Sequence, residues 1–313
     1  MKIPPPMHST AAAIFAHYEA QADDGLRAHL GGSEIGGECE RAIWYSFRWV
    51  ARSKFDGRTL RLFETGKREE ARVHANLRAI GCRMSGLKKQ IRVTAVGGHA
   101  GGSLDGIVKR LPEAPKTPHL LEVKTHSAKS FADLCKKGVK DSKPQHYAQM
   151  AFYCGLAGLT RWLYFAVNKD TDELHIERGE FDRAEFDRLM ERASRVVTAA
   201  EPPARLNDDK DYFVCKMCRF APLCHGEALP LVNCRTCLHS TASEGPPAPG
   251  MWHCAHYGQW MDAVEQSAEC PSHRYIPALL ANIAEPIDAD AEKNIVFYRR
   301  KDGSEFANDR AGI

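Results

Sequence analysis

The sequence predicts an α/β protein in which helices flank a mixed central sheet. Apolar residues follow helical spacing over the first 80 positions, alternate with a period of two from about 89 to 125, and then return to mixed helix and strand patterns. The length of 313 residues, 43% of them hydrophobic and 27% charged, suits one large domain or one medium domain with an appendage. No stretch approaches the roughly 18 consecutive apolar residues of a bilayer crossing, so we expect a cytosolic protein with no membrane partner.

Each predicted element follows from a local pattern. Apolar spacings of three and four predict helices over 9–30 with a break near 23–25, over 40–50, and over 60–80, where Gly81 ends the helix. Period-two alternation predicts three successive strands over 89–96, 103–110 and 119–125, separated by the turns GGHAGG and LPEAPKTP. A helix over 144–156, strands over 161–168 and 173–181, and a charged helix over 182–200 complete the expected core.

The composition changes after two prolines at 202 and 203, where the chain becomes irregular and rich in cysteine. We expect residues 1–228 to form the main domain, and residues 229–313 to form a cysteine-rich module that ends in a hairpin turning at Asp302-Gly303. Segment 241–250, TASEGPPAPG, is expected to contain no regular structure. The second module is too short for a generous core, so we expect a metal to hold it together.

Positive charge is concentrated in one stretch of a chain whose formal net charge is only +3. Between Arg48 and Arg92, thirteen basic residues stand against four acidic ones, a local charge of +9. A second basic patch comprises Lys129, Lys136, Lys137, Lys140 and Lys143. Runs of charge are often solvated faces, so phosphate binding by these stretches needs the support of a reactive site.

A carboxylate and a lysine on one strand supply a candidate reactive site. In HLLEVKT, a period of two places Glu122 and Lys124 on one face and Leu121 and Val123 on the other, toward a core. Asp105 on the preceding strand would bring a second carboxylate beside Glu122, at a sheet edge open to solvent. Two carboxylates near phosphate oxygens suit Mg²⁺ or Mn²⁺, and a lysine there can orient or stabilise the attacking water. From the ExK pattern alone, a surface ion pair is the simpler alternative.

The order of elements resembles the core of the PD-(D/E)xK nucleases: a helix, strands that carry Asp105 and then Glu122-x-Lys124, and a further helix. The further helix reads HYAQMAFY, in which Gln149 and Tyr153 lie four apart and share a face. This pair resembles the QxxxY motif of the RecB and AddB branch of that superfamily. A Leu-Asp pair stands where the family's name motif has Pro-Asp, a position that varies widely in the family.

The basic helix carries another marker of the same branch in FETGKREEARVH, where Glu70 and His74 lie four apart. His74 resembles that branch's upstream histidine, an additional metal ligand. Glu70 stands where related phage recombination exonucleases carry an acidic residue, so it acts with His74 or instead of it. The resemblance implies the following roles: Asp105, Glu122 and His74 hold the metal, Lys124 assists the hydrolytic water, and Gln149 with Tyr153 positions the lysine, the metal site or the DNA backbone.

A first cysteine set lies after the expected core. CKMCRFAPLC places Cys215, Cys218 and Cys224 in a CxxCx5C pattern, and three thiolates need a fourth ligand. The same resemblance implies that Cys39 is that ligand, because RecB-like nucleases with an iron-sulfur cluster carry one cysteine before the core and three after it. We therefore expect a structural [4Fe-4S] cluster that clasps the N-terminal helices onto the core, although zinc would accept the same four thiolates.

A second cysteine set comprises Cys234, Cys237, Cys254 and Cys270. Zinc is the simplest occupant of four thiolates, although the spacing is looser than in a zinc ribbon. Four nearby histidines could each replace one ligand: His239, His253, His256 and His273. The alternative is that Cys254 and Cys270 only pack in a small core. Of eleven cysteines three remain as packing residues, and none is needed for a disulfide in a cytosolic protein.

These expectations describe a metal-dependent deoxyribonuclease, an exonuclease that hydrolyses phosphodiester bonds at DNA ends in recombination, repair or phage replication. Its substrate would be DNA, as single strands or duplex ends, held by the basic stretches in a channel that passes the reactive site. A bacterial cytosol or a phage-infected cell would be its location, and a recombination or replication protein its partner. Two alternatives stay open: a CRISPR-adaptation nuclease that trims spacer precursors, and a non-catalytic DNA-binding or assembly subunit that retains the fold.

Overall fold

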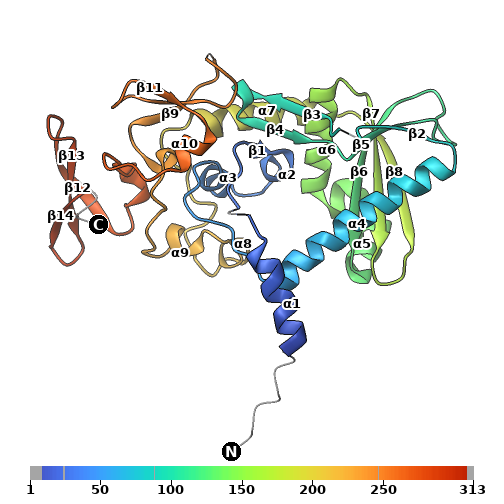
Figure 1. The fold of residues 1–313 in the computed structure, drawn as a ribbon, viewed down its shortest axis with the longest axis horizontal. Coiled ribbons are helices and arrows are strands. Elements are labelled where there is room, and N and C mark those ends of the chain that lie inside the picture. The colour runs from blue at the N-terminus through green and yellow to red at the C-terminus, as the bar shows by residue number, and fades with distance from the viewer. Residues whose placement is uncertain (1–8, 24, 88, 246, 309–313) are drawn as a thin grey trace, which may run out of the picture.

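The computed structural model in Figure 1 describes residues 9–23, 25–87, 89–245 and 247–308. Its central sheet has five strands in the order β2-β5-β6-β7-β8. All neighbours are antiparallel except β6 and β7, so the mixed central sheet expected from the sequence is confirmed. The five strands are β2 (Arg83–Ser85), β5 (Gly106–Lys109), β6 (His119–His126), β7 (Arg161–Asn168) and β8 (Leu174–Glu180).

Helices cover both faces of this sheet, which is why seven of the eight residues of β7 are buried. On one face lies α4 (Gly57–Ala79), whose Val73 and Leu77 pack against apolar residues of β5, β6 and β7. On the other face, α5 (Ala128–Ser142) and α6 (Pro144–Ala157) form the crossover between the two parallel strands. A further helix, α7 (Arg183–Thr198), packs on α6.

Local capping fixes the ends of the helices that carry candidate residues. At the start of α4, Asp56 Oδ1 accepts a hydrogen bond from the backbone N–H of Thr59 at 2.7 Å. Pro144 begins α6, and Gly158 ends it in the left-handed conformation with φ of 64°. The helices predicted over 60–80 and 144–156 are therefore confirmed to within one turn.

A second, smaller sheet joins the N-terminal segment to the core. Its strand order is β1-β4-β3, with β1 parallel to β4 and β4 antiparallel to β3. Helix α1 has no buried residue and lies against α4, away from the rest of the body (Figure 1). The elements of this region are α1 (Ser9–Ala20), β1 (Leu30–Gly31), α2 (Gly32–Ile35), α3 (Glu40–Phe47), β3 (Arg92–Ala95), a 3₁₀ helix (Val96–Gly98) and β4 (Ala100–Ser103).

Several sequence-based element predictions were wrong. The strand predicted over 89–96 is confirmed as β3, which lies in the small sheet, whereas β2 and α5 were missed. The predicted turn GGHAGG overlaps β4. This strand contains two glycines, so it lacks the alternating side chains by which a strand is recognised. Glycine is needed at 101 because a Cβ there would overlap the carbonyl oxygen of Val93. The first helix ends at Ala20 rather than at 30. Asp24, Lys88 and Pro246, which fall in predicted segments, lie outside the described residues.

Short elements follow α7 and pack beside the N-terminal segment. The hairpin predicted at Asp302-Gly303 is confirmed, whereas Thr241 and Ala242 belong to β9, so segment 241–250 is not entirely irregular. Two antiparallel sheets have the orders β11-β10-β9 and β12-β13-β14, the latter at the opposite end of the molecule from the central sheet (Figure 1). The elements are α8 (Phe213–Lys216), α9 (Ala221–Cys224), a 3₁₀ helix (Cys234–Thr236), β9 (Ser240–Ala242), β10 (Trp252–Cys254), β11 (Gln259–Met261), α10 (Ala263–Ser267), a 3₁₀ helix (Pro277–Leu279), β12 (Ala284–Asp290), β13 (Ile295–Arg300) and β14 (Glu305–Ala307). No helix among the described ranges has the length and apolar character needed to cross a membrane.

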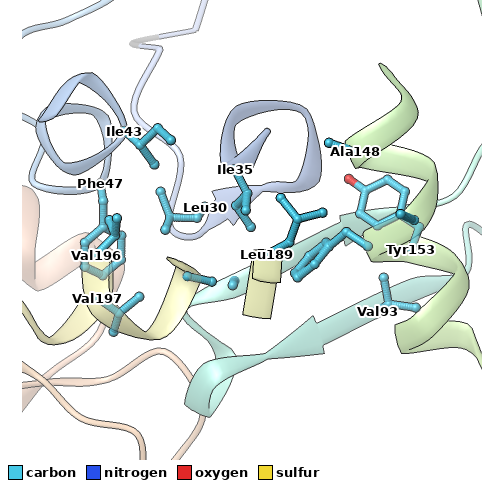
Figure 2. Packing of buried hydrophobic residues seen from close by; sticks show 14 of the residues in the cluster. Leu30, Ile35, Ile43, Phe47, Val93, Ala148, Tyr153, Leu189, Val196 and Val197 are labelled. Carbon is cyan, nitrogen blue, oxygen red and sulfur yellow. The ribbon is translucent and has the colours of Figure 1, made fainter. Parts of the chain in front are cut away.

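The largest hydrophobic cluster centres on the segment from β1 to α3. Figure 2 shows Leu30, Ile35 and Phe47 of this segment beside Tyr153 of α6 and Val196 of α7. The same cluster continues into the cysteine-rich part of the chain, where it includes buried residues of β10 and β11. One continuous core thus extends across position 228, the boundary expected between the two domains.

Two buried arginines reinforce this junction. The Arg235 guanidinium lies 3.7 Å from the ring centre of Trp49 and donates hydrogen bonds to the carbonyls of Phe47 and Ala28, both at 2.9 Å, and to Gln266 Oε1 at 2.8 Å. Arg48, only 2% exposed, donates to backbone carbonyls from three segments. Burial lowers the pKa of Arg48 to about 10 and lowers that of Arg235 as well. Arg48 is therefore a structural residue and is unavailable to phosphate, contrary to its inclusion in the basic stretch.

We expect Arg235→Ala to destabilise the protein by about 3 kcal/mol or more, because three backbone and side-chain acceptors from separate segments lose their buried donor. Urea unfolding of the full chain measures the change. Arg183→Ala on the exposed face of α7 is the matched control and should shift the unfolding free energy by no more than about 0.5 kcal/mol. Equal effects of the two substitutions would contradict the role assigned to Arg235.

Candidate active site

Strand β6 presents its polar residues on the face of the central sheet that α6 covers. Glu122, Lys124 and His126 point to that face, while Leu121 and Val123 join the cluster under α4, as period two predicted. Glu122 is fully buried, and the Lys124 side chain keeps 28% of its exposure. The expectation that Glu122 lies at an open sheet edge was wrong, because β6 pairs with β5 and β7 on either side and α6 covers it.

The two carboxylate oxygens of Glu122 have different surroundings. Oε1 accepts hydrogen bonds from Lys124 Nζ and from Gln149 Nε2, the latter at 2.8 Å. Oε2 is buried without a partner among the described residues, and so is Gln149 Oε1. Burying a carboxylate oxygen without a partner costs free energy. Oε2 can therefore accept a hydrogen bond from one more donor or bind a cation.

Asp105 is held against the same strand. It precedes β5, and its Oδ2 accepts a hydrogen bond from the backbone N–H of Val123 at 2.9 Å. The antiparallel register pairs Gly106 with Leu121, which brings Asp105 beside the peptide that follows Glu122. Backbone pairing of β5 with β6 thus holds the Asp105 carboxylate against the peptide that follows Glu122.

Helix α4 brings Glu70 and His74 toward Asp105. Glu70 Oε1 lies 4.0 Å from His74 Nε2, which is buried without a hydrogen-bond partner in the described part of the chain. Burial raises the pKa of Glu70, and the negative charge of Asp105 raises it further. Burial lowers the pKa of His74, with the charge of Asp105 opposing the change. Because Asp105 acts on both groups, the structure assembles residues of α4, β5 and β6 at one place.

Electrostatics make Glu122 and Lys124 an unequal pair. Burial raises the pKa of Glu122 to about 7, the positive charge of Lys124 lowers it, and Asp105 and Glu70 raise it. Burial lowers the pKa of Lys124, but the carboxylates of Glu122 and Asp105 raise it by more, so its pKa lies above the ordinary lysine value. Lys124 therefore remains a cation near neutral pH, while Glu122 titrates there.

The two residues of the QxxxY pair have separate surroundings. Gln149 touches Glu122, whereas the ring of Tyr153 packs toward the N-terminal segment (Figure 2). A Cβ on Gly32 would lie 2.6 Å from Cε1 of this ring, and one on Gly102 would overlap its phenol oxygen. Burial and the charge of Glu122 raise the pKa of Tyr153 to about 12, so the phenol stays neutral. Tyr153 consequently joins α6 to β4 and α2 behind the carboxylates.

Sequence reasoning missed a buried polar cluster next to Lys124. The Tyr164 hydroxyl lies 2.9 Å from His126 Nε2 and 2.7 Å from His146 Nδ1. Burial, together with the positive charges of Lys143 and Lys124, lowers the pKa of His126 to about 4 and that of His146 to about 3. The cluster is therefore neutral. Extending the period of two from Lys124 to His126 would have found one member, but Tyr164 enters only through the register of β6 with β7.

The four cysteines of the first set surround one cavity of about 440 Å³. Cys39 begins α3 as its N-cap, where its Sγ accepts a hydrogen bond from the backbone N–H of Ala42 at 3.4 Å. Cys215, Cys218 and Cys224 line the same cavity from α8 and α9 and the loop between them. Burial raises the pKa of the Cys215 and Cys218 thiols, and the neighbouring cysteines raise both further.

The second set is also drawn together. Burial and the neighbouring Cys237, Cys270 and Cys254 together raise the pKa of Cys234 to about 12, so the other three thiols lie within electrostatic reach of Cys234. The backbone N–H of Arg274 donates to Cys237 Sγ at 3.5 Å. All eleven cysteines are free thiols.

The chemistry of the donors suits different metals at these places. Throughout the described ranges, no three histidine, cysteine or acidic side chains already have the geometry that holds a metal ion. At the carboxylate site, the unpartnered Glu122 Oε2 is an oxygen donor of the kind that Mg²⁺ or Mn²⁺ prefers, and the unpartnered His74 Nε2 is a nitrogen donor of the kind that transition metals accept. Thiol sets such as the other two suit softer metals.

Asp105 and Glu122-x-Lys124 thus lie on a mixed sheet whose face is covered by α6. The chain matches the PD-(D/E)XK nuclease superfamily over residues 7–225 and belongs to that superfamily. Its members use divalent metal ions such as Mg²⁺ or Mn²⁺ to cut nucleic acid.

The solved structures to which this chain is similar share little sequence with it. The alkaline exonuclease LHK-Exo from Laribacter hongkongensis is 16% identical, with 58% of this chain and 90% of that chain covered and a TM-score of 0.40. Its complex with dAMP is 15% identical, with 59% and 90% covered and a TM-score of 0.33. A protein named SSO0001 is 13% identical, with 70% and 98% covered and a TM-score of 0.43. The curated proteins contain no match.

The buried carboxyl of Glu122 predicts a pH-dependent loss of stability in the metal-free protein. Its folded-state pKa of about 7 exceeds the ordinary value of 4.5, so between these values the folded chain keeps a proton that the unfolded chain releases. The contribution is present below pH 4.5 and is lost as pH rises through 7. The Glu122→Gln variant has no carboxyl at this position, so its stability should not fall with rising pH for this reason. Urea unfolding from about pH 5 to about pH 8 should show the wild type weakening relative to the variant, by up to about 1.4 kcal/mol per pH unit. Parallel pH profiles would refute this.

Proposed function

We propose that this chain is a metal-dependent deoxyribonuclease, and specifically an exonuclease that acts at DNA ends. The observation that carries the proposal is the meeting of Asp105 with Glu122 and Lys124, at a carboxylate that keeps one buried oxygen without a partner. The resemblance of Gln149, His74 and Glu70 to residues of the RecB and AddB branch and of phage recombination exonucleases supports the action at ends.

The donors at the site fit one or two hard cations. Asp105 and Glu122 would hold Mg²⁺ or Mn²⁺, with His74 or Glu70 completing the set. The bound cation would stabilise negative charge on the phosphate and lower the pKa of a water molecule. Because a ligand must be deprotonated, cation binding would displace the proton that the raised pKa of Glu122 keeps on part of the population near neutral pH.

The protein's own residues have distinct parts in the hydrolysis. A water oxygen bonds to phosphorus, the bond from phosphorus to a sugar oxygen breaks, and that oxygen takes up a proton. Lys124 stays protonated, so it serves to orient the water or to stabilise charge on the phosphate rather than to accept a proton. Gln149 fixes Oε1 of Glu122, which leaves Oε2 directed to the cation. Tyr153 acts indirectly, by positioning α6.

We expect Asp105→Asn and Lys124→Gln each to lower the cleavage rate about 100-fold or more, because each removes charge from the place where phosphate charge develops. The assay follows linear single-stranded, linear double-stranded and circular DNA with Mg²⁺ or Mn²⁺. Asp187→Asn on the exposed part of α7 is the matched control and should cleave as the wild type does.

The substrate comparison also separates the alternatives. Cleavage of circular DNA would replace the exonuclease proposal with an endonuclease. Absence of cleavage by the wild type on every substrate would favour a non-catalytic DNA-binding or assembly subunit. Preferential trimming of short overhanging duplexes would favour a CRISPR-adaptation nuclease over a role in recombination, repair or phage replication beside a protein partner.

We further propose a [4Fe-4S] cluster on Cys39, Cys215, Cys218 and Cys224, and zinc on Cys234, Cys237, Cys254 and Cys270. The convergence of Cys39 with three cysteines far along the chain on one cavity supports the first. The proximity of four thiols within the cysteine-rich segment supports the second. Each metal would fix irregular chain that has little core of its own.

We expect anaerobically purified protein to contain iron and sulfide together with zinc, and to show a broad visible absorption. Cys218→Ser should remove the iron and the absorption but leave the zinc, whereas Cys237→Ser should remove the zinc and leave the iron. Cys135→Ser, which changes an exposed thiol outside both sets, should alter neither. Metal analysis that finds zinc in both sets would overturn the cluster.

A further inference from the structure

A groove of about 1540 Å³ lies outside the carboxylate site, along the N-terminal half of α4. Its walls come from α1, from segments 21–23, 25–27 and 52–56, and from residues 60–67 of α4. Figure 1 shows α1 lying against the beginning of α4, where these segments meet. Nothing assigned to the site so far explains an opening of this size.

An aromatic pair stands in the wall of the groove. Phe55 and Phe63 are each 45% exposed, and their ring centres are 5.0 Å apart with the planes at 81°. The two rings touch each other edge to face, but neither belongs to a buried cluster. Exposed rings held in a fixed arrangement offer flat apolar surfaces to an incoming planar group.

The charged side chains of the groove differ in how they are bonded within the protein. Its five acidic side chains all accept hydrogen bonds from the protein itself: Glu19 from Gly57 N, Asp23 from Gly25 N, Glu34 from Ser46, Asp56 from Thr59 N, and Glu64 from Tyr18 and Arg68. In contrast, four exposed basic residues form no ion pair within the described ranges: Arg27, Arg52, Lys54 and Lys67. The groove therefore presents, beside its aromatic pair, four cations that are unpaired in the described part of the chain, while Glu19, Asp23 and Asp56 keep their negative charge because their donors are neutral backbone N–H groups.

The groove leads to the carboxylate site along one helix face. Phe63, Lys67, Glu70 and His74 follow one another at intervals of four, three and four residues on α4, so they share a face. At 1.5 Å per residue, Glu70 lies about 10 Å along the helix axis from Phe63. A chain lying in the groove would thus reach the residues around Asp105 within a few nucleotides.

We propose that this groove binds single-stranded DNA, with bases stacking on Phe55 and Phe63 and phosphates meeting Arg52, Lys54 and Lys67. The aromatic rings require unpaired bases, since the faces of paired bases are already stacked in a duplex. Free cations interleaved with aromatic rings are the recurrent means of holding a single strand without sequence preference. This inference rests on the proposed function and adds to it the strand form and the path of the substrate.

Binding without cleavage tests the groove separately from the chemistry. The full chain, without added divalent cation, is titrated into a labelled single-stranded oligonucleotide and into a blunt duplex of the same sequence, with fluorescence anisotropy as the readout. Phe55→Ala and Phe63→Ala should each weaken single-strand binding about fivefold or more and leave duplex binding within about twofold. Phe213→Ala, which removes a ring that is 75% exposed on α8, is the matched control.

Salt dependence tests the charges. Removing one basic side chain that neutralises a phosphate should reduce the slope of log affinity against log salt by about 0.7 on a single strand. The double variant Arg52→Gln with Lys54→Gln should therefore have a slope smaller by about 1.4. Lys116→Gln, on the loop between β5 and β6, should keep the wild-type slope.

The outcomes distinguish this proposal from the nuclease itself. Unchanged single-strand affinity in the folded Phe55→Ala/Phe63→Ala double variant, or no single-strand binding by the wild type, would overturn the groove even if the wild type cleaves DNA. Loss of binding in that variant would uphold the groove even if the wild type cleaves nothing. Circular dichroism and thermal melting establish that the variants are folded.

Discussion

The buried guanidinium of Arg235 holds distant parts of the chain together. A guanidinium deprived of water must find acceptors, and it finds them at Ala28, at Phe47 and at Gln266. These acceptors fix the N-terminal segment against the cysteine-rich segment. The same N-terminal segment provides Gly32, on which Tyr153 of α6 packs, and Cys39. Tyr153 of α6 thus packs on the same N-terminal segment that Arg235 fixes. This segment links the position of α6 over the central sheet to Arg235.

Backbone pairing between strands, rather than the conformation of loops, fixes the positions of the carboxylates in the candidate site. Asp105 is held by a peptide N–H of β6, Glu122 lies within that strand, and Gln149 descends from the helix above. The neutral cluster of His126, Tyr164 and His146 adjoins Lys124 without adding charge, so the acidic groups alone hold the lysine in its protonated form. Rigid elements that present a carboxylate with one free oxygen suit a cation better than a flexible loop would.

Apart from α5, which was missed, the sequence predicted long elements well and short ones badly. The eight-residue strand β7 was placed correctly because its apolar run is uninterrupted, and β6 because Leu121 and Val123 alternate with Glu122 and Lys124. Strands of two to four residues show too little periodicity, so β2 was missed and β4 was taken for a turn. Within the site, the pairing of Asp105, Glu122 and Lys124 was predictable, whereas the complete burial of Glu122 depends on α6 covering it. Tyr164 was beyond reach because only strand register brings it to His126.

The contacts of Arg235 join residues that are far apart in the sequence. This separation affects the order in which the protein folds during its synthesis. Arg235 reaches back to Ala28 across 207 residues, and Gln266 must also be present before its guanidinium is satisfied. Contacts between such distant positions form late, because the intervening chain must first be made and its loops closed. A nascent chain that ends after the helices around the carboxylates lacks Arg235 and Gln266. The contacts of Arg235 therefore cannot yet fix the N-terminal segment. Assembly of the reactive centre in its final form therefore awaits translation through Gln266.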